Sequence, residues 1–131
     1  MPASAESAAV TTAVVRYMVW IPVPALPEED RDDLVVQFMV NGPIVPRVGE
    51  RLEFDGPGGR NLSLVVSGVE HAFLIKSAQT AEQTQVVVTA ELGESSPLID
   101  TARELLEPAA LYRWVSHFEQ LELPEHLLHR L

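Results

Sequence analysis

Residues 61–75 read NLSLVVSGVEHAFLI, and their apolar side chains change phase once along this stretch. Leu62, Leu64 and Val66 share one face of an extended chain. After Gly68 the apolar positions are odd-numbered, at Val69, Phe73 and Ile75. A β-bulge at Ser67–Gly68 would absorb the extra residue and bend the strand. Small barrels turn their corners in this way, so the stretch predicts a strongly bent strand in a small barrel.

Four further stretches alternate apolar and other residues with the period of a strand. They are residues 10–21, 34–40, 51–55 and 84–92. The first is largely apolar on both faces, because Met18 and Trp20 stand opposite the row of Tyr17, Val19 and Ile21. We therefore expect this strand to be covered on both sides or to lie in an interface.

Residues 55–60, DGPGGR, raise the alternative of a phosphate-binding loop. Such a loop needs a helix after it, whose N-terminus faces the anion, and usually a lysine. The sequence that follows has the pattern of a strand, and the loop has no lysine. The composition predicts a turn between two strands of a hairpin.

The pattern changes to a helical period after Ser95. Ser96 is predicted to cap a helix that has Pro97 at its first position and ends near Glu107, before Pro108. A second helix places an apolar stripe on one face, and residues 124–131 predict a short third helix. The stripe of the second helix is Leu111, Trp114, Val115, Phe118 and Leu121.

These elements together predict an α+β fold. It is a five-stranded, strongly bent antiparallel sheet or a small SH3-like or OB-like barrel, followed by two to three C-terminal helices that cover an open face or end. We expect a disordered lead-in over residues 1–9 and one domain over residues 10–131. Its β part is residues 10–93 and its helical part residues 95–131.

Composition excludes several classes of function. The 131 residues contain no cysteine, which excludes disulfides and thiolate chemistry. The net charge of −10 disfavours nucleic acid, whose phosphates need clustered basic residues. The N-terminus has no basic signal segment, and the apolar run that follows is interrupted by Arg16, Pro22 and Pro24. We expect a cytoplasmic protein that binds no membrane.

No catalytic constellation is expected. Ser63, Ser67 and His71 lie close in sequence, but they lack the context of a nucleophile elbow. His71 is expected to be a hydrogen-bonded structural histidine, with a general base or ligand as the alternative. His126 and His129 have a spacing that permits a metal, yet a solvated helix face is the better reading. We expect no metal and no cofactor.

The candidate binding residues are acidic or aromatic. An acidic run surrounds Arg31 and is interpreted as a solvated loop or a docking patch for a basic protein. Trp20, Tyr17 and His71 are the remaining candidates. The acidic run consists of Glu28, Glu29, Asp30, Asp32 and Asp33.

The first functional hypothesis is a non-enzymatic protein-binding module, such as an inhibitor or immunity-type protein that neutralises a basic partner. The second is a structural or assembly component, a homo-oligomer that self-associates through its first strand or its C-terminal helices. The third is a small-molecule binder or small enzyme that uses the barrel interior near His71 and Tyr17. Residues 46–92 resemble small bacterial or phage β-barrel proteins of unassigned function, and this resemblance implies no activity.

Overall fold

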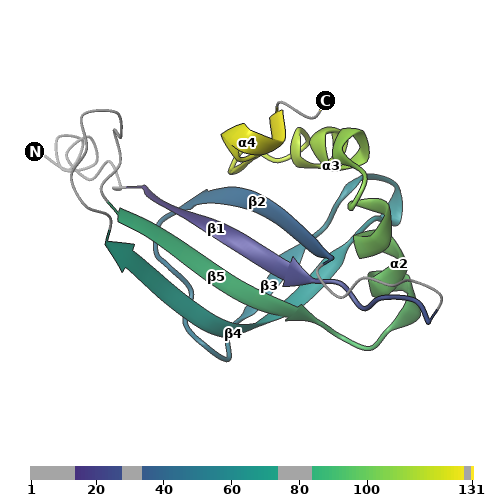
Figure 1. Cartoon of the computed structure of the whole chain (residues 1–131), viewed down its shortest axis with the longest axis horizontal. Coiled ribbons are helices and arrows are strands. Elements are labelled where there is room, and N and C mark those ends of the chain that lie inside the picture. Colours follow the sequence, from purple (N-terminus) through teal and green to yellow (C-terminus); the bar gives the residue numbers. More distant parts are fainter. Residues whose placement is uncertain (1–13, 28–33, 74–83, 129–130) are drawn as a thin grey trace, which may run out of the picture.

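The computed structural model describes residues 14–27, 34–73, 84–128 and 131. It has an α+β fold in which a curled sheet comes first and helices follow (Figure 1). The predicted lead-in lies outside the described residues. The strands are β1 (Val15–Pro22), β2 (Val35–Gly42), β3 (Arg51–Phe54), β4 (Leu62–Phe73), β5 (Thr84–Leu92) and β6 (Leu121–Glu122). The helices are α2 (Ser96–Glu104), α3 (Pro108–Val115) and α4 (Glu125–Leu128), with a 3₁₀ turn η1 (Pro57–Gly59).

The described strands form one mixed sheet in the order β3-β4-β5-β1-β2-β6. The predicted α+β fold with a strongly bent sheet is confirmed, and the sheet differs from the antiparallel expectation at one place, where β1 and β5 pair in parallel. The chain reverses direction between successive strands from β1 to β5, so the first and fifth strands point the same way. When the sheet brings these two strands together, their pairing has to be parallel.

The bend in β4 is confirmed. Its register with β5 shifts between Val66 and Gly68, where the sequence predicts a bulge. Before the shift, Leu64 and Val66 lie on the buried face. After the shift, Val69 lies on the same face, opposite Val88 of β5. The bulge therefore keeps the apolar row facing inward while the strand bends.

The sheet curls until its two ends approach each other. Strands β2 and β3 stand near opposite ends of the sheet order, yet the rings of Phe38 and Phe54 lie 5.3 Å apart, edge to face. Trp114 of α3 packs on both rings, and Phe118 packs on Trp114 and Phe54. The sheet is a half-barrel, and its gap is filled by aromatic side chains from the helical segment.

The helices differ in detail from the prediction. The N-cap of α2 is Ser95 and not Ser96, and its side chain makes no capping hydrogen bond. This helix ends at Glu104, earlier than expected, so that Leu105 and Leu106 belong to the turn before α3. Leu121, predicted in the second helix, lies instead in β6, opposite Val40 of β2. An edge of the sheet thus gains a short sixth strand.

Residues 55–60 form the predicted turn between β3 and β4. Gly58 and Gly59 have φ angles of 66° and 76°, in the left-handed region that glycine tolerates best. Gly56 is required for a different reason. A Cβ atom there would overlap the Trp114 indole nitrogen and the Arg60 carbonyl oxygen.

The core fills the inner face of the half-barrel. Val19, Ile21, Phe38 and Val88 are fully buried, together with side chains from β4. The predicted inward row of the second strand is confirmed, because Leu34, Val36, Phe38 and Val40 all belong to this core. Among the described residues, no helix is long and apolar enough to cross a membrane.

Candidate functional site

The structure separates the residues that the sequence singles out for binding. The acidic run of residues 28–33 lies outside the described residues, and β2 begins shortly after it. This run contains the candidates Glu28, Glu29, Asp30, Asp32 and Asp33. Tyr17 is buried in the core, and burial raises the pKa of its hydroxyl group. His71 is exposed near the end of β4, and Trp20 is partly exposed on the opposite face of the sheet.

Tyr17 and His71 point to the inner face but do not adjoin. His71 lies opposite Val86 of β5, and β5 stands between β4 and β1 in the sheet. Two interstrand spacings therefore separate the backbones of the two residues, about 10 Å. The buried apolar side chains of the core occupy the inner face beyond them.

Trp20 lies on the outer face of β1, where it is 39% exposed. Its indole nitrogen is 3.0 Å from the sulfur of Met18, the preceding residue on this face. Met18 is thereby covered, at 7% exposure, which explains how a strand with two apolar faces remains compatible with solvent. The ring of Trp20 presents the uncovered part of this face.

A hollow of about 440 Å³ lies beside Trp20. Trp20 is opposite Thr89 of β5, and Thr89 is opposite Gly68, the bulge residue of β4. Because glycine has no side chain, the bulge leaves space beside the indole ring. A Cβ atom at Gly68 would come no closer than 4.0 Å to another heavy atom, the Cβ of Thr89.

One carboxylate, that of Glu70, lines this hollow, and a second, that of Glu91, lies nearby on the same outer face. Trp20, Thr89 and Gly68 form one cross-strand row on the outer face. Glu70 of β4, opposite Val87, lies in the next outer-face row on one side, and Glu91 of β5 lies in the next row on the other side. Neither carboxylate has a hydrogen bond or an ion pair within the described residues. We call this region the Trp20 surface. It consists of Trp20, Val65, Gly68, Glu70, Val87, Thr89 and Glu91.

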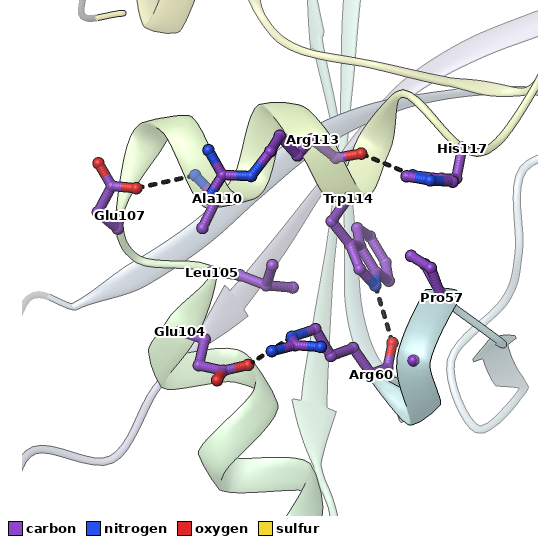
Figure 2. Close-up of a pocket in the computed structure, with 10 residues that line it drawn as sticks. Pro57, Arg60, Glu104, Leu105, Glu107, Ala110, Arg113, Trp114 and His117 are labelled. Carbon is purple, nitrogen blue, oxygen red and sulfur yellow. Dashed lines mark hydrogen bonds and ion pairs between the residues drawn. The ribbon is translucent and has the colours of Figure 1, made fainter.

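A second hollow, of about 640 Å³, opens between the turn η1 and the helices α2 and α3. Figure 2 shows its side chains, with Leu105 and Trp114 between Arg113 on one side and Arg60 on the other. Leu105 and Trp114 are each 2% exposed. We call this site the helix pocket, and its lining is Pro57, Gly58, Arg60, Glu104, Leu105, Glu107, Ala110, Arg113, Trp114 and His117.

Polar contacts fix the walls of the helix pocket (Figure 2). The Trp114 indole N–H donates to the Arg60 carbonyl oxygen at 2.8 Å, which ties α3 to the turn. Arg60 Nε donates to Glu104 at 2.9 Å, which ties the turn to α2. Glu107 accepts from the Ala110 backbone N–H at 2.8 Å and caps α3. The pocket is therefore preformed from three segments.

Sequence reasoning missed the helix pocket. It interpreted residues 55–60 as a turn only. His117 is exposed, and its Nδ1 donates a hydrogen bond to the Arg113 carbonyl oxygen at 2.8 Å. The available signal was the unusual density of glycine before Arg60, combined with a tryptophan on the apolar stripe of α3. Nothing in the sequence shows that these segments meet.

Neither site has side chains arranged as the ligands of a metal ion within the described residues. Across residues 14–27, 34–73 and 84–128, no group of three or more histidine or acidic side chains is placed to hold a metal ion. His126 of α4 is exposed, and His129 lies outside the described residues.

Comparison of the chain with protein-family models, with curated proteins and with solved structures gave no match.

Proposed function

We propose that this protein is a non-enzymatic protein-binding module whose Trp20 surface binds a basic protein partner, as an inhibitor or immunity-type protein would. The observation that carries the proposal is the exposed Trp20 ring beside a hollow lined by the Glu70 carboxylate, with the Glu91 carboxylate on the same face. Neither carboxylate has a partner within the described residues. Tryptophan is enriched among the residues that dominate binding energy. The bordering charges favour arginine or lysine on the partner.

The net charge of the whole chain also favours a basic partner. At −10, the protein attracts a basic partner over distances of about 10 Å at moderate ionic strength and repels nucleic acid. The acidic run of residues 28–33 would add to this attraction wherever it lies. The apolar part of the contact then comes from Trp20 and Val65, which is 46% exposed.

The test is a pull-down from the source cells with the tagged protein, at low and at high salt, with mass spectrometry of the retained proteins. Trp20→Ala is the test variant. Tyr112→Ala is the matched control, because Tyr112 is an aromatic residue of α3 that is 47% exposed and lies outside the Trp20 surface. Circular dichroism establishes that both variants remain folded.

We expect one basic protein to be retained by the wild type and by Tyr112→Ala, and to be released progressively as salt increases. Trp20→Ala should weaken this complex about 30-fold, which corresponds to a hot-spot contribution of about 2 kcal/mol. Equal retention by Trp20→Ala, or retention that is insensitive to salt, would contradict the proposal.

Retention of copies of this chain alone would favour the assembly alternative. Both edges of β1 are already paired, with β5 and with β2. Copies would therefore meet through the outer face of β1 or through the C-terminal helices, and not by pairing of the first strand edge to edge. A response of the wild type to small ligands that His71→Ala abolishes would favour the third hypothesis, and an unchanged response in this variant would remove it.

A further inference from the structure

We propose that the helix pocket binds a small amphipathic carboxylate, with its apolar or aromatic part on Leu105 and Trp114 and its carboxylate at Arg113. This site is separate from the Trp20 surface. The inference rests on the contacts of the pocket and on the unequal use of its charged groups.

The floor of the pocket favours an apolar group. Leu105 and Trp114 are almost fully buried, and Pro57 and Ala110 form adjoining walls. Trp114 belongs to the packed aromatic cluster that closes the half-barrel, so its ring is held in place from behind. The volume of about 640 Å³ is in the ordinary range for a small-molecule site.

The charged groups of the rim are used unequally. One oxygen of Glu104 accepts from Arg60, and one oxygen of Glu107 accepts from the Ala110 N–H. Arg113, in contrast, has no hydrogen bond or ion pair through its guanidinium within the described residues, although its carbonyl oxygen accepts from His117. The unused donor capacity of the pocket is concentrated on Arg113.

Arg60 adds further donors on the opposite wall. Its Nε is committed to Glu104, but no contact within the described residues uses the two terminal guanidinium nitrogens. A carboxylate can accept two parallel hydrogen bonds from one guanidinium, which makes it the matching ligand group.

The rigidity of the walls reduces the cost of binding. Four hydrogen bonds fix the turn, the end of α2 and the start and end of α3 around the same hollow. A ligand that enters orders few additional groups, so more of its contact energy appears as affinity. The same chemistry is offered by a free aromatic acid and by a peptide that ends in an aromatic residue.

Nuclear magnetic resonance of the full chain tests the proposal with phenylacetate as the probe. The indole N–H of Trp114 lies in the pocket wall, and Trp20→Phe removes the signal of the other tryptophan. In this background we expect phenylacetate to shift the Trp114 indole signal in a saturable way in the millimolar range. Phenylacetamide, which has the same ring and no charge, should bind about 10-fold more weakly.

Arg113→Gln should weaken phenylacetate binding about 10-fold, because it removes the charged donor from an exposed position without disturbing the floor. Arg47→Gln is the matched control and should change nothing, because Arg47 pairs with Glu50 outside the pocket. Ala110→Leu should block the pocket in the folded protein. Equal binding of acid and amide, or unchanged affinity in Arg113→Gln, would overturn the proposal.

A peptide arm distinguishes the two sources of the ligand. N-acetyl-Gly-Phe with a free C-terminus is compared with phenylacetate in the same titration. Binding about 10-fold tighter than phenylacetate supports a peptide C-terminus as the ligand, whereas weaker binding supports a free aromatic acid. Both results support the carboxylate site, and Arg113→Gln must reduce whichever is stronger.

Discussion

The two tryptophans of this protein stand in opposite surroundings. Trp114 is 2% exposed, touches three other aromatic rings and donates its N–H to a carbonyl oxygen. Trp20 is 39% exposed, and its N–H donates to the Met18 sulfur, a weak acceptor. Trp114 completes the inner face of the half-barrel, whereas Trp20 lies on the outer face beside a hollow.

The difference separates the face whose packing stabilises the fold from the face that we propose for recognition. On the inner face, ring packing and a satisfied donor make Trp114 a closing element of the core. On the outer face, a large ring with a weakly satisfied donor stands beside carboxylates without partners in the described residues. We therefore expect removal of Trp114 to lower the stability of the fold and removal of Trp20 to affect binding more than stability.

Replacing both tryptophans in turn is the strongest test of this contrast. Trp114→Ala should lower the free energy of unfolding by about 3–5 kcal/mol, because it empties the aromatic cluster and leaves the Arg60 carbonyl oxygen without its donor. Trp20→Ala should lower it by about 1 kcal/mol or less. Urea unfolding followed by circular dichroism measures both values.

Losses of similar size for the two variants would break the contrast between the faces. A Trp20→Ala protein that is fully stable but no longer binds the partner would sharpen the contrast, because binding would then be lost without any loss of the fold.

Two glycines provide a smaller test at the backbone level. Gly56→Ala should destabilise the protein by about 1–3 kcal/mol, because its Cβ would overlap Trp114 and the Arg60 carbonyl oxygen. Gly68→Ala is the matched substitution on the outer face, where the nearest heavy atom is 4.0 Å away. It should leave stability unchanged or increase it by up to about 1 kcal/mol. Thermal unfolding of the two variants measures both changes in stability. A larger loss in Gly68→Ala than in Gly56→Ala would contradict the conclusion that the inner face is the more tightly packed one.

Tyr17 gives the smallest expected effect, and only at high pH. Burial raises the pKa of its hydroxyl group above the ordinary value of about 10. Above that value the unfolded chain loses the proton while the folded chain keeps it, so the folded state binds more protons and its stability falls as pH increases. Tyr17→Phe should match the wild type near neutral pH and lose less stability as the pH rises above about 10. Identical alkaline curves for the two proteins would show that Tyr17 is not sheltered on the inner face.

The strands followed from the sequence because their signals are local. The period-two rows predicted β4 and β5 closely, and the change of phase at Gly68 predicted the bulge. The parallel pairing of β1 with β5 was not predictable in the same way, since it depends on which strand edges meet. Leu121 shows the same limit, because its position on an apolar stripe is compatible with a helix until β2 offers it an edge.

The candidate sites were less predictable than the fold. The strand that holds Trp20 was expected to be covered on both sides or to lie in an interface, and the structure leaves Trp20 partly exposed. The hollow beside it depends on Gly68, which is distant in sequence. Tyr17 and His71 both point to the inner face, but the sequence does not show that β5 stands between their strands. The helix pocket combines segments about 50 residues apart, and each segment alone resembles ordinary turn or helix sequence.

The sequence by itself determined the class of fold, the bend in β4, the glycine turn before Arg60 and the acidic charge, because each depends on residues that are neighbours along the chain. Only the tertiary structure decided that Phe38 meets Phe54, that Arg113 faces a preformed pocket and that Trp20 has a hollow beside it. These features arise where the curled sheet brings distant segments together, and the position of that closure is fixed by packing across the whole core rather than by any local pattern.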